Sequence, residues 1–95
     1  MPLFAFHCVD KPNSLDVRVA TREAHLAYLG GFKDELRLAG PMLGVDDAPV
    51  GSILFVELES RAAAEAFAAN DPYAQAGLFQ TVEITGFRAS IGTLG

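Results

Sequence analysis

The chain has 95 residues, with 7 Lys and Arg against 12 Asp and Glu, so its formal net charge is −5. Hydrophobic residues make up 51 % and charged residues 20 %, a balance typical of a folded protein rather than a disordered one. The length predicts a single domain over residues 1–95. An acidic chain without a cluster of Lys and Arg is a poor partner for a phosphate backbone, so we expect no nucleic-acid binding.

The sequence carries no signal for a membrane or for secretion. No apolar run approaches the roughly 20 residues of a membrane span. The N-terminal residues have no positive charge before their apolar stretch, unlike a signal peptide. The single cysteine, Cys8, cannot form an internal disulfide. We therefore expect a cytoplasmic protein with no membrane partner.

The first predicted element is a strand over residues 3–9, which is apolar and contains aromatic side chains. A loop follows at residues 10–14. Next comes a helix that Asn13 or Ser14 could cap, with Thr21 as a second capping residue if the helix is split. Its main body is predicted over residues 21–36, because one stripe repeats at spacings of four and three residues. The stripe consists of Arg18, Arg22, His25, Leu29, Phe32 and Leu36.

The rest of the chain predicts a hairpin, a second helix and a last strand. Ser60 is suited to cap an alanine-rich helix, and Asn70-Asp71-Pro72 ends that helix. The predicted elements are strands over residues 37–45 and 51–58 around a turn at 46–49, a helix over 61–69, one helical turn over 73–77, and a strand over 79–87.

This order of elements is that of the ferredoxin-like βαββαβ fold, an α+β architecture with two helices on one face of an antiparallel sheet. Both sheet faces are apolar: Leu54 and Val56 point one way, whereas Ile53 and Phe55 point the other. Solvent on the second face would produce alternating polar residues. A second copy of the chain is the simplest cover for that face, so we predict a homodimer packed sheet to sheet.

His25 is the first candidate for chemistry. It shares a stripe with Leu29 and Phe32, so it faces inward, where a histidine can act as an acid or base near neutral pH. The alternative is a core histidine hydrogen-bonded to a carbonyl group. Asp71, before Pro72, is typical of a turn. Its functional interpretation is a carboxylate partner that would fix the tautomer of His25.

Arg22 and Arg18 lie one and two turns before His25 on the stripe. Two guanidinium groups beside an imidazole would suit an anionic substrate, because Arg binds carboxylates with paired hydrogen bonds. The alternative is that both form surface ion pairs with acids such as Asp16 or Glu23.

Three further residues are weaker candidates for a binding site. Ser52, which follows Gly51, could donate to a ligand oxygen, although the pattern favours turn chemistry and a strand start as its explanation. Tyr73 could offer a hydroxyl group or simply pack, and Pro41 follows Gly40 in the same hairpin. His7 and Cys8 point to opposite sheet faces and cannot grip one metal ion, so we predict no metal site and no cofactor.

Taken together, these residues resemble the YciI-like, YCII-related family over nearly the whole chain, from about residue 3 to residue 87. No single motif is specific, but their order and spacing are. The matching stretches are Asp10-Lys11-Pro12-Asn13-Ser14-Leu15 with Arg18, Arg22-Glu23-Ala24-His25-Leu26, Ala39-Gly40-Pro41-Met42, Gly51-Ser52, Glu59-Ser60, Asn70-Asp71-Pro72-Tyr73 and Ala76-Gly77.

The resemblance implies a ferredoxin-like fold assembled as a dimeric α+β barrel. It also implies an active site built around a histidine and an aspartate, which here would be His25 and Asp71. The residues matching positions that tend to line the same pocket are Arg18, Arg22, Pro41, Ser52 and Tyr73. A related enzyme removes chloride from a hydroxylated aromatic ring, and neighbouring families act on small cyclic substrates.

Two functions therefore remain open at the level of sequence. The first is a cofactor-independent enzyme in which a His25–Asp71 dyad performs acid/base chemistry on a small cyclic or aromatic, anionic substrate. The second is a non-catalytic module that binds a small molecule or a partner protein, with His25 and Asp71 as a structural pair.

Overall fold

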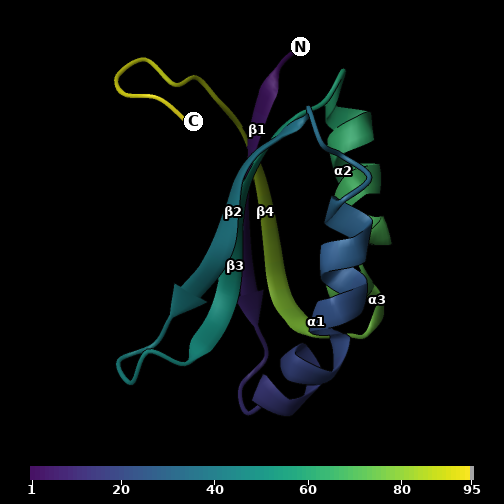
Figure 1. Ribbon diagram of the computed structural model, residues 1–95, viewed down its shortest axis with the longest axis vertical. Coiled ribbons are helices and arrows are strands. Elements are labelled where there is room, and N and C mark those ends of the chain that lie inside the picture. Colours follow the sequence, from purple (N-terminus) through teal and green to yellow (C-terminus); the bar gives the residue numbers. More distant parts are fainter. Residues whose placement is uncertain (95) are drawn as a thin grey trace.

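The computed structural model describes residues 1–94. In these residues the chain forms a four-stranded antiparallel sheet in the order β2-β3-β1-β4, and the helices pack on one of its faces (Figure 1). The elements are β1 (Leu3–Asp10), α1 (Leu15–Leu29), β2 (Leu36–Leu43), β3 (Pro49–Glu57), α2 (Arg61–Asn70), α3 (Pro72–Gln75) and β4 (Phe79–Phe87). This order and this topology confirm the predicted ferredoxin-like α+β fold.

Helix α1 ends at Leu29, so the prediction that it continues to Leu36 is wrong. Glycine is unfavourable inside a helix, and Gly30-Gly31 begins a tighter turn in which the N–H of Phe32 donates to the carbonyl of Leu29. Phe32 and Leu36 nevertheless pack against the core, so the apolar stripe outlasts the helix. The helix is not split at Thr21, because it runs unbroken from Leu15.

The predicted cap of the second helix is confirmed. The hydroxyl of Ser60 accepts a hydrogen bond from the backbone N–H of Ala63 at 3.1 Å. The chain then turns at Asp71 into the short helix α3, which Pro72 begins. No helix within residues 1–94 is long and apolar enough to span a membrane.

The two faces of the sheet differ in what covers them. The face toward the helices carries the buried core, which comprises Phe4, Phe6, Cys8, Leu29, Leu54, Val56, Leu58, Ala64 and Phe67. On the opposite face, Leu38 is 52 % exposed and Ile53 is 41 % exposed. The rings of Phe55 and Phe87 lie 5.1 Å apart on that same face. We refer below to the first as the helix-covered face and to the second as the open face.

Candidate active site

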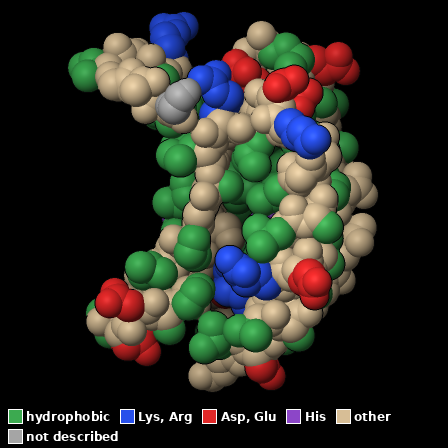
Figure 2. Space-filling view, in the orientation of Figure 1, with side chains coloured by type: hydrophobic (Ala, Val, Ile, Leu, Met, Phe, Trp, Pro, Cys, Tyr) green, Lys and Arg blue, Asp and Glu red, His purple; other side chains and the backbone are tan. Residues whose placement is uncertain are grey.

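A pocket of about 470 Å³ lies between α1 and the β2–β3 side of the helix-covered face. Figure 2 shows this hollow between the sheet and the helices, with apolar side chains on its walls. Its size falls within the range of small-molecule sites. The lining residues are Leu15, Arg18, Val19, Arg22, His25, Leu26, Leu29, Ala39, Gly40, Pro41, Pro49, Ser52, Leu54 and Tyr73.

Six of the seven residues named from the sequence line this one pocket. They are His25, Arg18, Arg22, Pro41, Ser52 and Tyr73. The seventh, Asp71, does not line it but lies behind His25, where it is buried. The structure therefore brings together residues from α1, β2, β3 and the α2–α3 junction.

His25 and Asp71 are joined by a buried hydrogen bond of 2.8 Å between Nδ1 and Oδ1. The two residues are 46 positions apart in the sequence, and the bend at Asp71 brings them together. The same Oδ1 accepts the backbone N–H of Tyr73 at 2.9 Å. Asp71 therefore orients the imidazole and caps α3 at the same time.

The second ring nitrogen of His25, Nε2, faces the pocket. Every fully buried side-chain nitrogen or oxygen in residues 1–94 has a hydrogen-bond partner. Nε2 makes no hydrogen bond to another described residue, so it is not fully enclosed. An ionised carboxylate can only accept a hydrogen bond, so Asp71 holds the proton on Nδ1 and leaves Nε2 free to exchange one with a ligand.

Tyr73 connects the histidine to the arginine two turns away on α1. Its ring stacks on that of His25 with centroids 4.0 Å apart, and the guanidinium carbon of Arg18 lies 4.6 Å from its centroid. Burial raises the pKa of Tyr73, and the positive charges of Arg18 and Arg22 only partly oppose this effect. The phenol therefore stays protonated and can donate a hydrogen bond.

Arg18 is held by two buried partners. Its Nε and Nη2 donate to the two carboxylate oxygens of Asp10 at 2.7 and 2.9 Å, and Nη2 also donates to Oγ of Ser52 at 2.9 Å. Burial alone would lower the pKa of Arg18, but hydrogen bonding and the charge of Asp10 raise it above its usual value. The alternative interpretation from the sequence, a surface ion pair with an acid such as Asp16 or Glu23, is wrong for Arg18, because its partner is the buried Asp10.

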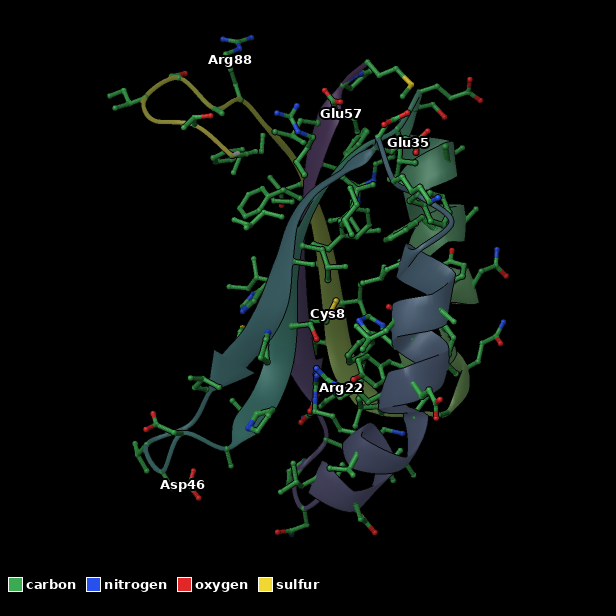
Figure 3. All side chains as sticks on the ribbon, viewed as in Figure 1. Cys8, Arg22, Glu35, Asp46, Glu57 and Arg88 are labelled. Carbon is green, nitrogen blue, oxygen red and sulfur yellow. The ribbon has the colours of Figure 1, made fainter. Side chains whose placement is uncertain are left out.

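Arg22 differs from Arg18, because no acidic residue in the described part of the chain pairs with it. It is exposed, lines the pocket, and forms no ion pair with any residue in the described part of the chain, including Asp16 and Glu23. Figure 3 shows Arg22 in the space between α1 and the sheet. The surface-pair alternative is therefore wrong for Arg22 as well.

The structure adds four residues that the sequence reasoning missed. The sequence patterns place Asp10 in a loop, yet it extends the inward alternation of Phe4, Phe6 and Cys8 along β1, and this alternation is the signal that points to it. Three apolar residues at the pocket mouth, Leu15, Val19 and Leu26, flank the predicted stripe on α1. The predicted stripe contains one residue for each turn of the helix, so it does not include these three.

The glycine before Ser52 is required by close packing. A side chain at Gly51 would collide with the carbonyl oxygen of Cys8 and with the end of the Met42 side chain. The absence of a side chain at Gly51 lets β3 pack closely against β1 beside the buried Ser52. Gly40 has open space around its α-carbon, so no contact explains it.

Cys8 lies beside the site, but its thiol is unreactive. Burial, with a smaller contribution from the charge of Asp71, raises the pKa of its thiol to about 12. Within residues 1–94 no three His, Cys, Asp or Glu side chains are grouped so that they could hold a metal ion.

Three comparisons place the chain among known proteins. Residues 2–88 match the YCII-related domain. Protein YciI of Escherichia coli O6:H1 is 40 % identical over 94 residues, covering 90 % of this chain and 96 % of that protein. A solved structure of 5-chloro-2-hydroxyhydroquinone dehydrochlorinase from Burkholderia phenoliruptrix, in complex with 2,5-dihydroxybenzoquinone, is 37 % identical with a TM-score of 0.87. That match covers 90 % of this chain and 93 % of the other.

Proposed function

Because this chain belongs to the YCII-related family, we propose that it is a small-molecule enzyme in which His25, oriented by Asp71, moves a proton on a small, anionic cyclic or aromatic substrate. One observation carries the proposal. His25 has one ring nitrogen held by a buried carboxylate and the other at the wall of a ligand-sized pocket. This is the arrangement that a general acid or base needs.

The proposed chemistry uses groups that the chain itself supplies. Nε2 takes a proton from the substrate or returns one to it, while Asp71 stabilises the imidazolium through Nδ1. A well-placed acid or base contributes about 10²- to 10⁴-fold in rate. Proton transfer by an imidazole needs no cofactor, so we propose a cofactor-independent reaction.

The substrate class is supported by the lining of the pocket and by one relative. The walls are mainly apolar and suit a ring, whereas Arg22 suits a negative charge. The dehydrochlorinase named above acts on a hydroxylated, chlorinated ring, as its name states. At 37 % identity and a TM-score of 0.87, it supports a substrate of the same class for this chain.

The test is the turnover of a hydroxylated ring by His25→Gln, which keeps a polar side chain of similar reach. With 5-chloro-2-hydroxyhydroquinone as the probe, we expect chloride release to fall by at least about 10²-fold while the fold is kept. His7→Gln is the matched control for the loss of a histidine. Because His7 lies on the open face with its side chain 49 % exposed, sedimentation checks the oligomeric state of this variant before its turnover is compared. Full turnover by a folded His25→Gln protein would show that the histidine is not catalytic.

A second function, that of a non-catalytic binding or partner module, is favoured by one contact. Asp71 also accepts the backbone N–H of Tyr73, so the His25–Asp71 pair has structural work even without catalysis. This function predicts that hydroxylated ring compounds bind to wild type without turnover and that His25→Gln changes their affinity alone. Measuring binding and turnover on the same samples separates the two functions.

We also propose that the protein works as a homodimer packed through its open face, in the reducing environment of the cytoplasm. The exposed Leu38, Ile53 and Phe87 would be costly to leave in water. A lone free thiol fits a reducing compartment. Sedimentation should show a dimer that Ile53→Lys dissociates, and a wild-type monomer at micromolar concentration would contradict this assembly.

A further inference from the structure

Among residues 1–94, one cation at the pocket has no carboxylate partner. As far as the structure describes it, the lining contains three basic side chains, Arg18, Arg22 and His25, and no carboxylate. Asp10 stands directly behind Arg18, and Asp71 stands directly behind His25. In the described part of the chain, Arg22 is therefore the one lining cation that no carboxylate contacts.

The mouth of the pocket is otherwise apolar and exposed. Leu15, Val19 and Leu26 of α1 line it and are 45, 66 and 47 % exposed. Ala39, Pro41 and Pro49 line it from the β2–β3 side. A flat apolar ring between α1 and the β2–β3 hairpin would bury both of its faces. Burial of apolar surface is the main favourable contribution to the free energy of small-molecule binding.

Arg22 and His25 are three positions apart on α1, so their side chains project from the same face of the helix, with Cβ atoms about 5–6 Å apart. Both side chains line the same pocket, so one ring compound bound there can contact the guanidinium group of Arg22 and the imidazole of His25.

From this placement we infer that Arg22 determines the charge specificity of the pocket: it binds a single anionic substituent of a ring compound, and Asp10 excludes a second one by neutralising Arg18. This inference rests on the proposed function, because it assumes that the substrate occupies this pocket. It assigns different roles to two arginines that look equivalent in the sequence. Arg22 contacts the substrate, and Arg18 is a positioning residue that holds Tyr73 and Ser52.

The test compares three matched ligands, benzoate, benzamide and phthalate, by NMR titration of wild type and three variants. Wild type should bind benzoate about tenfold more tightly than benzamide, and phthalate no better than benzoate. In Arg22→Gln the preference for benzoate over benzamide should disappear. In 0.5 M NaCl the wild-type preference should shrink, because a partly exposed charge is screened.

The control is Arg88→Gln, which changes the net charge equally. Arg88 lies at the top of the view in Figure 3, whereas Arg22 lies in its lower half between the sheet and α1. The Arg88→Gln substitution should therefore leave all three affinities unchanged. Asp10→Asn, if it folds by circular dichroism, should uncover the charge of Arg18 and favour phthalate over benzoate. If it does not fold, the comparison of wild type with Arg22→Gln still decides the inference.

Two outcomes overturn the inference in different ways. If wild type binds benzoate and benzamide equally, or if Arg22→Gln keeps the preference, charge specificity does not reside at Arg22, although the pocket still binds rings. If none of the ligands shifts a resonance of the pocket residues, the pocket itself is not the binding site, and the proposed function fails together with the inference.

Discussion

The helix-covered face of the sheet has two halves of opposite character, and strand β1 runs through both. Phe4 and Phe6 pack in one half, where Phe67 meets Phe6 at 5.2 Å and Phe32 meets Phe67 at 4.8 Å between ring centroids. Four residues further along β1, the same inward direction belongs to Asp10, which binds Arg18 in the other half. Strand alternation decides where a side chain points, whereas its chemistry decides whether that half becomes core or site.

Stability and function are located in different halves of this face. The apolar half is filled by aromatic packing around the buried side chains of Phe4, Phe6 and Phe67. The polar half contains Asp10, Arg18, Ser52, His25 and Asp71, all buried, and in the described chain none of their fully buried polar atoms lacks a partner. Polar groups that are paired in this way tolerate burial, and the space between them becomes the pocket.

The largest expected effect is on the apolar half. Phe6→Ala removes a side chain that is 1 % exposed, and we expect the free energy of unfolding to fall by about 3–5 kcal/mol. Urea denaturation measures this loss. Ile91→Ala, at a residue 97 % exposed, is the control and should change nothing measurable. A loss below about 1 kcal/mol for Phe6→Ala would mean that this half is not the main core.

A smaller effect is expected in the polar half. Asp71→Asn keeps the shape of the side chain but weakens its bonds to His25 and to the N–H of Tyr73, so unfolding should be easier by about 1–3 kcal/mol. Turnover should fall as well if the enzyme proposal is right. A variant that is inactive yet as stable as wild type would show that the pair is purely functional, and an unstable but fully active one would show the reverse.

The smallest effect on stability at neutral pH concerns Cys8, at the border between the halves. Folding raises the pKa of the Cys8 thiol from 9.0 to about 12, because burial disfavours the thiolate. The contribution of this protonated thiol to the free energy of unfolding is therefore complete below pH 9 and is lost as the pH rises from 9 toward 12. At pH 8 we expect iodoacetamide to modify the folded protein about a thousandfold more slowly than the protein unfolded in urea. Equal rates in the two states would show that the border is open to water.

The two halves also differ in how far the sequence could predict them. The strands, the Ser60 cap and the fold follow from local patterns, because alternation and capping act over a few residues. The end of α1 did not, since the apolar stripe through Phe32 and Leu36 continues past Gly30-Gly31 in a non-helical turn. A periodic pattern reports a buried face more reliably than it reports the limits of a helix.

The candidate site depended on contacts that no spacing reveals. The inward direction of His25 could be derived from its stripe, but its contact with Asp71 joins residues 46 positions apart. Likewise, Arg18 and Arg22 look equivalent on the stripe, and only the fold shows that Asp10 reaches one and not the other. The identity of a charge's partner is a tertiary property.

The long separations within the polar half also mean that the pocket does not exist in the unfolded chain. Arg18 and Ser52 are 34 positions apart, and His25 and Asp71 are even further apart. Any compound that binds there binds the native state alone, so a concentration a hundred times its Kd adds about 2.7 kcal/mol to stability. The melting temperature is thus a direct detector of ligands, and a library of small ring acids can be searched by thermal shift before any reaction is known.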